Sequence, residues 1–320
     1  MIDLFRQLGF LFVYVVGSSG ISWRQTSLLC GCVTTVVPFV AFWFLPNSPR
    51  WLATKSRLPE ARSSLKFYRG EEYKIDQELD DITKQLKPLA KDNSVTKQFE
   101  MLRQDSVMKR MFLLVFMFFA YQFTGNFSMI VFSVTIFQSV ESRIDSYMST
   151  IIVGFVRVFG VAFYIMVADK IGRRKLLLVS LALSSVAIAV MGGFFFAPSL
   201  GYDVSYVDWL PLLAMAVFVF FTCVAEPTLI LLRSELLPTS VRALGVSIIY
   251  IFFFSGAFLV SFLFPLMVDS IGSHGTFWTY ALSGVLMTIV GGLFIPETQG
   301  KSLEEIESSY RKGDHSIPKN

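Results

Sequence analysis

Residues 176–202 read LLLVSLALSSVAIAVMGGFFFAPSLGY and contain no Asp, Glu, Lys or Arg. An α-helix needs about 20 apolar residues to cross the hydrocarbon layer of a membrane, because each residue advances it by about 1.5 Å. This stretch is long enough and apolar enough to do so. It predicts a transmembrane helix.

Seven further segments have the same character. Five are also free of charged residues, namely 7–23, 25–49, 111–140, 243–268 and 275–296. Two more, 146–168 and 209–232, each contain a single interior charge, Arg157 and Glu226. With 53% hydrophobic and only 16% charged residues, the chain has more apolar surface than a soluble core can hold. We therefore expect an all-α membrane protein, a bundle of about eight transmembrane helices.

Positive charge is divided unevenly between the connections. When alternate connections are assigned to opposite sides, one side receives nearly all Lys and Arg, Arg6 included, while the other receives only Arg24 and Arg143. The cytoplasmic side retains positive charge during insertion, so both termini are expected in the cytoplasm. The net charge of +4 then belongs to loops beside anionic membrane lipid, and no nucleic-acid partner is needed to explain it.

One long hydrophilic stretch, 46–110, separates the first two apolar segments from the last six. Apolar residues recur at helical spacing in 59–67 and 73–86, which predicts two short amphipathic helices, the second ending near Pro88. The expected organisation is two transmembrane helices in 1–45, a cytoplasmic helical linker in 46–108, a six-helix unit in 109–295 and a cytoplasmic tail in 296–320.

Four short motifs follow one another along the chain. They are PNSPRWL at 46–52, DKIGRR at 169–174, Glu235 with Arg242 at the end of the sixth segment, and PETQG at 296–300 followed by SLEEI. In this order they resemble the motifs of sugar porters of the major facilitator superfamily, closest in style to insect facilitated trehalose and hexose carriers. The resemblance covers nearly the whole chain. It implies facilitated, alternating-access transport of a sugar, in the plasma membrane.

The resemblance also implies a cytoplasmic gate made of the motif residues. Gly172 permits a tight backbone between two helices, and arginines offer planar paired donors to carboxylates such as Glu235. Such pairs would hold the cytoplasmic helix ends together in one of two states. The alternative is that these arginines only orient the chain and bind lipid phosphates. The gate residues are Pro46, Ser48, Pro49, Arg50, Asp169, Gly172, Arg173, Arg174, Glu235, Arg242, Pro296, Glu297, Thr298 and Gly300.

Aligned on these motifs, the first apolar segment corresponds to the fifth of the family's twelve helices. The second half of the family fold is then complete, and the first four helices have no counterpart. We expect a truncated form, or a chain that associates with the missing helices or with a full-length homologue.

The candidate substrate ligands are Gln122, Asn126, Arg157 and Glu226. Gln122 and Asn126 lie in YQFTGNF at 121–127, where the family carries a similar amide-rich sequence, and amides both donate and accept hydrogen bonds to a sugar. A charge inside the membrane normally faces the bundle interior or a water-filled path. Arg157 is thus either a ligand or the structural partner of Glu226. Pro227, which follows Glu226, is expected to break the helix of segment 209–232.

Two other functions compete with sugar transport. An organic-ion carrier of the same superfamily would use Arg157 and Glu226 for a charged substrate. A non-transporting receptor or regulatory fragment would explain the missing helices. No metal-ligand cluster, nucleotide-binding loop or nucleophile arrangement is recognisable in the sequence, so we expect neither catalytic residues nor a metal or cofactor, and no enzyme.

Overall fold

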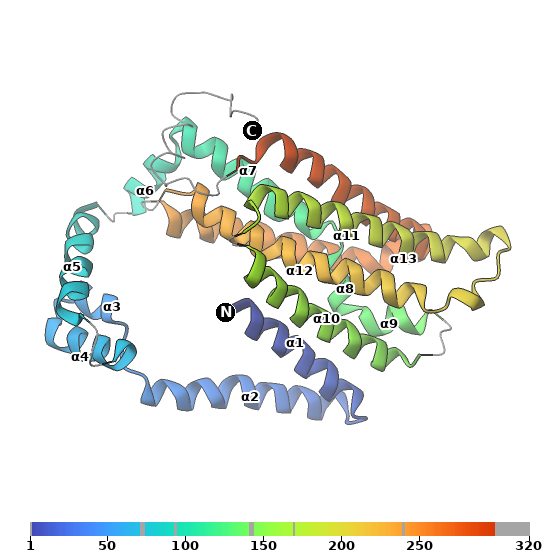
Figure 1. The fold of residues 1–320 in the computed structure, drawn as a ribbon, viewed down its shortest axis with the longest axis horizontal. Coiled ribbons are helices and arrows are strands. Elements are labelled where there is room, and N and C mark those ends of the chain that lie inside the picture. Colours follow the sequence, from blue (N-terminus) through green and yellow to red (C-terminus); the bar gives the residue numbers. More distant parts are fainter. Residues whose placement is uncertain are drawn as a thin grey trace. The chain divides into compact units, whose positions relative to one another are not determined.

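The computed structural model describes residues 2–70, 74–92, 95–140, 144–168, 170–238 and 241–297. These residues form helices and contain no strand (Figure 1). The chain divides into two compact units, one made of Met1–Ile21 with Leu102–Asn320 and the other of Ser22–Met101. Each unit is described by itself.

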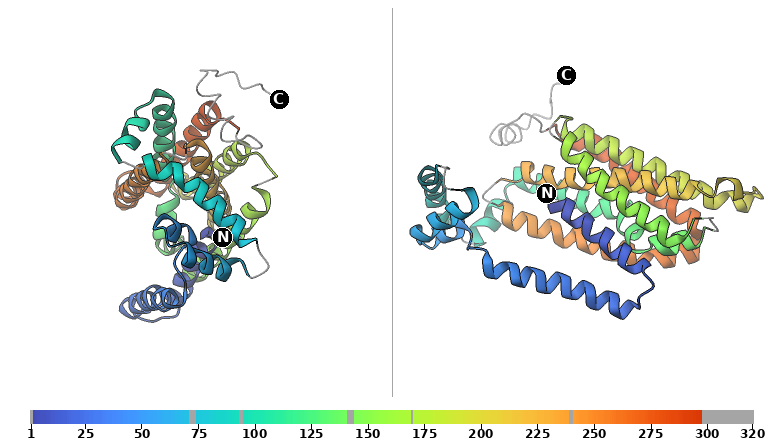
Figure 2. Two further views of the ribbon diagram at one scale, coloured as in Figure 1. Left: turned by 90° about the vertical axis from the view of Figure 1, so that its left-hand side faces the viewer. Right: turned by 60° about the horizontal axis from the view of Figure 1, so that its bottom comes forward.

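The first unit is a bundle of long apolar helices. α11 packs against α12 and α13, α13 against α7, and α10 against α12 and α1. These long helices run side by side in the right-hand view of Figure 2. Two buried apolar clusters form the core, one around Met191, Met215 and Phe218, the other around Leu177 and Leu229. The helices are α1 (Ile2–Ser18), α7 (Asp105–Gln122), α8 (Asn126–Val131), α9 (Ser133–Gln138), α10 (Ser146–Val167), α11 (Arg173–Phe196), α12 (Leu210–Leu236) and α13 (Arg242–Phe294), with 3-10 turns η1 (Ala197–Leu200) and η2 (Ser205–Val207).

Six helices of the described chain are long and apolar enough to cross a membrane. One of them, α13, has 53 residues and is interrupted at Gly272, where φ is 75°. A straight helix of this many residues would extend roughly 80 Å at about 1.5 Å per residue, more than twice the roughly 30 Å hydrocarbon layer. The interruption at Gly272 instead divides α13 into two helical parts, which correspond to the expected segments 243–268 and 275–296. α1, with 17 residues, is shorter than a full span. A helical membrane bundle is thus confirmed, with a helix or half-helix for each expected segment.

The second unit contains α2 (Trp23–Phe44), α3 (Pro49–Thr54), α4 (Leu58–Arg69), α5 (Ile75–Asp92) and α6 (Val95–Leu102). Two ion pairs join α4 to α5, Arg62 with Asp76 at 2.8 Å and Arg69 with Glu78 at 3.1 Å. Both expected linker helices are present. The expected end near Pro88 is wrong, because α5 continues to Asp92; a proline removes one N–H donor but need not end a helix.

The two helices expected in residues 1–45 fall in different compact units, and the expected domain bounds stay a prediction. α1 belongs with the first unit, since it packs against α10, whereas α2 belongs with the second.

The apolar run 111–140 is three helices and not one. α7 ends at Gln122 and α8 begins at Asn126, with Gly125 between them at a φ of 86°. A Cβ at Gly125 would lie 2.3 Å from Cδ2 of Tyr280, so only glycine fits this turn. The expected break at Pro227 is not observed, because α12 runs through this proline from Leu210 to Leu236.

Candidate functional site

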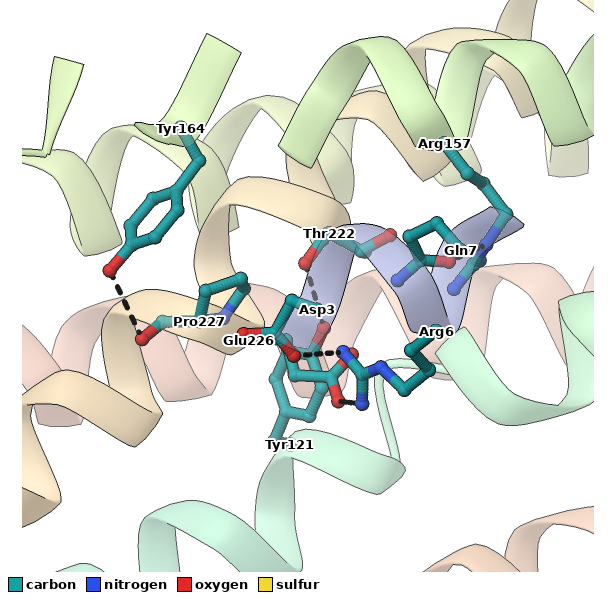
Figure 3. A network of polar contacts seen from close by, with 9 residues as sticks. All are labelled: Asp3, Arg6, Gln7, Tyr121, Arg157, Tyr164, Thr222, Glu226 and Pro227. Atoms are coloured by element: carbon teal, nitrogen blue, oxygen red, sulfur yellow. Dashed lines mark hydrogen bonds and ion pairs between the residues drawn. The ribbon is translucent and has the colours of Figure 1, made fainter. Parts of the chain in front are cut away.

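A network of charged and polar side chains connects α1 with the middle of α12 (Figure 3). Nη1 of Arg6 lies 2.5 Å from Oε1 of Glu226, and its Nη2 lies 3.1 Å from Oδ1 of Asp3. The Glu226 side chain is only 6% exposed, while that of Arg6 is 36% exposed. A buried carboxylate in an apolar helix requires such a partner, because an unpaired charge there is costly.

Arg157 lies on the neighbouring face of α10 and is 1% exposed. Its Nε donates a hydrogen bond to Oε1 of Gln7 at 2.8 Å, and its Cζ lies 5.3 Å from the centre of the Phe10 ring. Nη1 and Nη2 of Arg157, like Nε2 of Gln7, are buried and have no hydrogen-bond partner among the described residues. Two nitrogens of the guanidinium, each with two N–H groups, are therefore without an acceptor among the described residues.

Two hydroxyl groups tie the neighbouring helices to the same part of α12. The Tyr121 hydroxyl donates to the carbonyl of Thr222 at 3.1 Å, and the Tyr164 hydroxyl donates to the carbonyl of Pro227 at 3.4 Å. α7, α10 and α1 thus converge on one stretch of α12 around Glu226 (Figure 3).

Two expectations about charges are corrected here. The ion pair of Arg157 with Glu226 is not formed; Glu226 binds Arg6, and Arg157 binds Gln7. Arg6, assigned to the cytoplasmic side by the count of loop charges, lies inside α1 beside the middle of α12. Arg6 and Gln7 are also the site residues that sequence reasoning missed. Their signal was two adjacent polar residues within an apolar helix.

Gln122 and Asn126 lie on either side of the break between α7 and α8, and both are buried. Nε2 of Gln122 and Oδ1 of Asn126 have no hydrogen-bond partner among the described residues. The side chain of Gln122 lies against α13 at Gly256. Among the described residues, no hydrogen bond joins these two amides to Arg157 or to Glu226.

At the end of α12, one arginine of the second motif meets the third motif. Nε of Arg173 lies 3.3 Å from Oε1 of Glu235, and both side chains are largely buried. Arg242, another of the arginines expected to bind motif carboxylates, donates from Nη2 to the carbonyl of Leu237 at 3.2 Å.

Glu297 of the fourth motif lies against the start of α11. Its Oε1 accepts a hydrogen bond from the main-chain N–H of Arg174 at 3.5 Å, and the Arg174 side chain donates to the carbonyl of Gly292. The φ of Gly172 is −49°, which any residue can adopt, so the backbone conformation here does not require glycine. The requirement is space, because a Cβ there would lie 2.3 Å from Oε2 of Glu297.

The first motif lies in the second unit, at the start of α3. Pro49 is the first residue of this helix, Ser48 precedes it without a side-chain cap, and Arg50 is exposed. The carbonyl of Pro46 accepts a hydrogen bond from the Tyr68 hydroxyl at 2.8 Å, which joins the motif to α4. In the fourth motif Pro296 follows Ile295, the residue that caps the end of α13. Three expected gate residues, Asp169, Thr298 and Gly300, lie outside the described residues.

The described residues contain no group of three or more His, Cys, Asp or Glu side chains that could hold a metal ion. The site is a set of hydrogen-bonding and charged groups enclosed by apolar helices. Such a site can bind a polar solute, and membrane carriers place their binding sites between helices or at broken helices.

Solved structures of similar fold are membrane carriers. One is described as the major facilitator superfamily proton:xylose symporter XylE bound to 6-bromo-6-deoxy-D-glucose. Its TM-score is 0.69 at 23% identity, and the match covers 95% of this chain and 64% of the XylE chain. The inward-open conformation of XylE from E. coli has a TM-score of 0.72 at 22% identity over 95% of this chain and 62% of its own. The fold is thus that of a major facilitator carrier.

The family model described as "Sugar (and other) transporter" matches residues 1–310, and the chain belongs to this family. Facilitated trehalose transporter Tret1 of Culex quinquefasciatus is 33% identical over 305 residues, 95% of this chain and 58% of that protein. The Tret1 of Apis mellifera ligustica is 32% identical over 311 residues, 96% of this chain and 61% of that protein. The chain spans less than two thirds of the length of these relatives.

Proposed function

We propose that this chain takes part in moving a sugar, of the trehalose or hexose kind, across the plasma membrane by facilitated diffusion. The support is its membership of the sugar transporter family and its similarity to proteins named facilitated trehalose transporters. Both termini are proposed to lie in the cytoplasm, as the distribution of positive charge indicates.

The observation that carries the proposal is a set of buried amide side chains with unused polar atoms. Nε2 of Gln7, Nε2 of Gln122 and Oδ1 of Asn126 have no hydrogen-bond partner among the described residues. A buried polar atom left unpaired costs about 1–3 kcal/mol, so a ligand that satisfies it gains correspondingly. Sugar hydroxyls both donate and accept and suit such amides, whereas an apolar solute does not.

The ion pair at the end of α12 supports a gate. Arg173 and Glu235 come from different helices and are held 3.3 Å apart with little exposure. In our proposal this contact forms in one state of the carrier and opens in the other, and bound sugar shifts the balance between the two. The break at Gly125, between two candidate ligands, is where α7 and α8 would change their angle.

Of the two competing functions, the organic-ion carrier loses its main support. It relied on Arg157 and Glu226 both facing a charged substrate, and Glu226 is already bound to Arg6. The non-transporting receptor keeps the same binding site and differs only in lacking flux. Binding therefore tests the site, and flux separates carrier from receptor.

Sugar binding by the purified 320-residue chain in detergent tests the proposed ligands. We expect saturable binding of radiolabelled glucose or trehalose that weakens about tenfold or more in Gln122→Ala, since one lost hydrogen bond to a buried ligand is worth about 1.4 kcal/mol. Gln138→Ala is the matched control, because Gln138 is an exposed glutamine at the end of α9. Equal weakening in both variants, or binding indifferent to Gln122, would count against the site.

A further inference from the structure

We infer that Tyr280 is a positioning residue: it holds the short helix α8 in place and acts on sugar binding through Asn126, the first residue of that helix. The inference rests on the proposed function, in which Asn126 is a ligand, and adds to it a residue that determines where this ligand lies.

α8 is too short to fix its own position. It has six residues, Asn126–Val131, and the turn at Gly125 separates it from α7. A helix of fewer than about 12–15 residues is marginally stable by itself, so the place of α8 depends on what it packs against, chiefly α13. Because Asn126 is buried at the start of α8, any shift or rotation of this helix moves its amide.

Tyr280, in the second part of α13, contacts α8 and the turn before it. Its ring lies against Gly125, where a Cβ would come within 2.3 Å of Cδ2 of Tyr280. Its hydroxyl lies 3.3 Å from Oγ of Ser128. Ser128 uses its single hydroxyl hydrogen for the carbonyl of Val260 at 3.2 Å, so Tyr280 is the donor to Ser128. This chain of hydrogen bonds ties α8 to both parts of α13, since Val260 and Tyr280 lie on opposite sides of the interruption at Gly272.

Stacked aromatic rings extend the same contact to the end of α8. Phe264 of α13 stacks on Tyr280, with ring centres 6.5 Å apart and an interplanar angle of 20°. It also stacks on Phe132, at 4.7 Å and 23°, and Phe132 is the residue that directly follows α8. Tyr280 and Phe264 are both buried. One buried group of side chains from α13 thus holds α8 along its length.

The amide of Asn126 contributes less to this hold. Its Oδ1 is buried and has no hydrogen-bond partner among the described residues, so this oxygen fixes neither its own position nor that of α8. A tyrosine that serves only core packing needs no more than a carbonyl for its hydroxyl, as Tyr121 finds at Thr222. The Tyr280 hydroxyl instead binds a side chain of the helix that carries a candidate ligand, two residues beyond that ligand.

A double-mutant cycle of sugar binding tests whether Tyr280 acts through Asn126. Equilibrium binding of radiolabelled glucose and trehalose is measured for the purified chain in four forms: unmodified, Tyr280→Phe, Asn126→Ala and the double variant. Tyr280→Phe keeps the ring and removes the hydroxyl, so we expect binding to weaken about threefold to tenfold, the range of one neutral hydrogen bond. In the Asn126→Ala background the same change should weaken binding by less than about 1.5-fold, because the amide that it displaces is absent. A merely structural tyrosine would weaken both backgrounds equally.

Hydrogen–deuterium exchange of the purified chain without sugar tests the hold on α8 directly. The main-chain N–H of Met129 donates to the carbonyl of Gly125 at 2.9 Å, and exchange at this amide reports how often α8 opens. We expect exchange across α8 to be about fivefold faster in Tyr280→Phe, and exchange across α11 to be unchanged.

Thr276→Val is the matched control for both measurements. It removes a buried hydroxyl about one turn from Tyr280, whose bond, 2.9 Å to the carbonyl of Gly272, stays within α13. Neither the exchange of α8 nor sugar binding should change. Ser128→Ala removes the acceptor of the Tyr280 hydroxyl and should speed the exchange of α8 as Tyr280→Phe does. It takes the place of Tyr280→Phe if that variant does not fold.

The outcomes separate this inference from the proposed function. Unchanged exchange of α8 in Tyr280→Phe, or equal weakening of binding in both backgrounds, overturns the inference and leaves sugar binding intact. Failure of the unmodified chain to bind either sugar overturns the proposed function, and faster exchange of α8 in Tyr280→Phe then still supports the hold of Tyr280 on α8.

Discussion

The pair of Arg6 with Glu226 gives the sharpest prediction about stability. Replacing Arg6 with methionine leaves a carboxylate that is 6% exposed without its partner at 2.5 Å. Breaking a fully buried ion pair costs about 3–5 kcal/mol. Because the Arg6 side chain is 36% exposed, the low end applies, and we expect Arg6→Met to destabilise the protein by about 3 kcal/mol.

Glu226→Gln is expected to cost less, about 1 kcal/mol, since the arginine it leaves behind is partly exposed and still lies 3.1 Å from Asp3. The double variant Arg6→Met with Glu226→Gln removes both charges and is expected to cost less than the sum of the two single changes, by about 2 kcal/mol. This difference is the energy that couples the pair.

Thermal unfolding of the purified chain in detergent, followed by tryptophan fluorescence, measures these differences. At roughly 2 °C per kcal/mol for a chain of this size, Arg6→Met should lower the midpoint by about 6 °C. The control is Arg57→Met, which breaks a pair of almost equal length, 2.6 Å to Glu60, whose side chains are 50% and 51% exposed. It should lower the midpoint by about 2 °C at most. Additive single changes, or an equal loss in the control, would refute the argument from burial.

Two further changes test other parts of the bundle. Gly125→Ala should destabilise the protein by more than about 1–2 kcal/mol, because alanine is strained at a φ of 86° and its Cβ would meet the Tyr280 ring. Gly193→Ala is the control: a Cβ at this helical glycine would have no neighbour within 4 Å, so the change should stabilise the protein slightly. Thermal unfolding followed by circular dichroism compares the two variants. Tyr121→Phe removes the hydroxyl that binds the Thr222 carbonyl and should cost about 1 kcal/mol by chemical denaturation, whereas an unchanged midpoint would mean that this bond contributes nothing.

The helices could be predicted from the sequence because a transmembrane helix requires only a continuous apolar run of sufficient length, which is a local property of the chain. A run such as 176–202 is apolar over the length of a membrane crossing, and α11 (Arg173–Phe196) and η1 occupy it. The kink at Gly272 likewise falls between two predicted segments. The motifs then gave the family, because short patterns in fixed order do not depend on how side chains meet.

The pairing of charges could not be predicted, because it depends on the relative rotation and displacement of helices far apart in sequence. Arg157 and Glu226 were the only charges inside two predicted helices, so they were natural partners for one another. The packing of α1 against α10 introduces Arg6 and Gln7, and these two residues take the contacts instead. Counting charges in loops had placed Arg6 outside the bundle, since a charge marks the end of an apolar run.

The broken helix at Gly125 is an intermediate case. The sequence there, Thr124-Gly125-Asn126, contains the glycine that the turn requires, but the apolar residues on both sides continue the pattern of a single helix. What fixes the break is the ring of Tyr280, from α13, which occupies the space of a Cβ. Such a contact is visible only in three dimensions.

Flux through liposomes that contain the purified 320-residue chain tests the central claim most directly. We predict saturable uptake of radiolabelled trehalose or glucose, accelerated by unlabelled sugar on the opposite side, as a two-state carrier requires. Uptake no faster than in protein-free liposomes, from a chain that binds sugar, would contradict transport by this chain and leave a binding protein in its place.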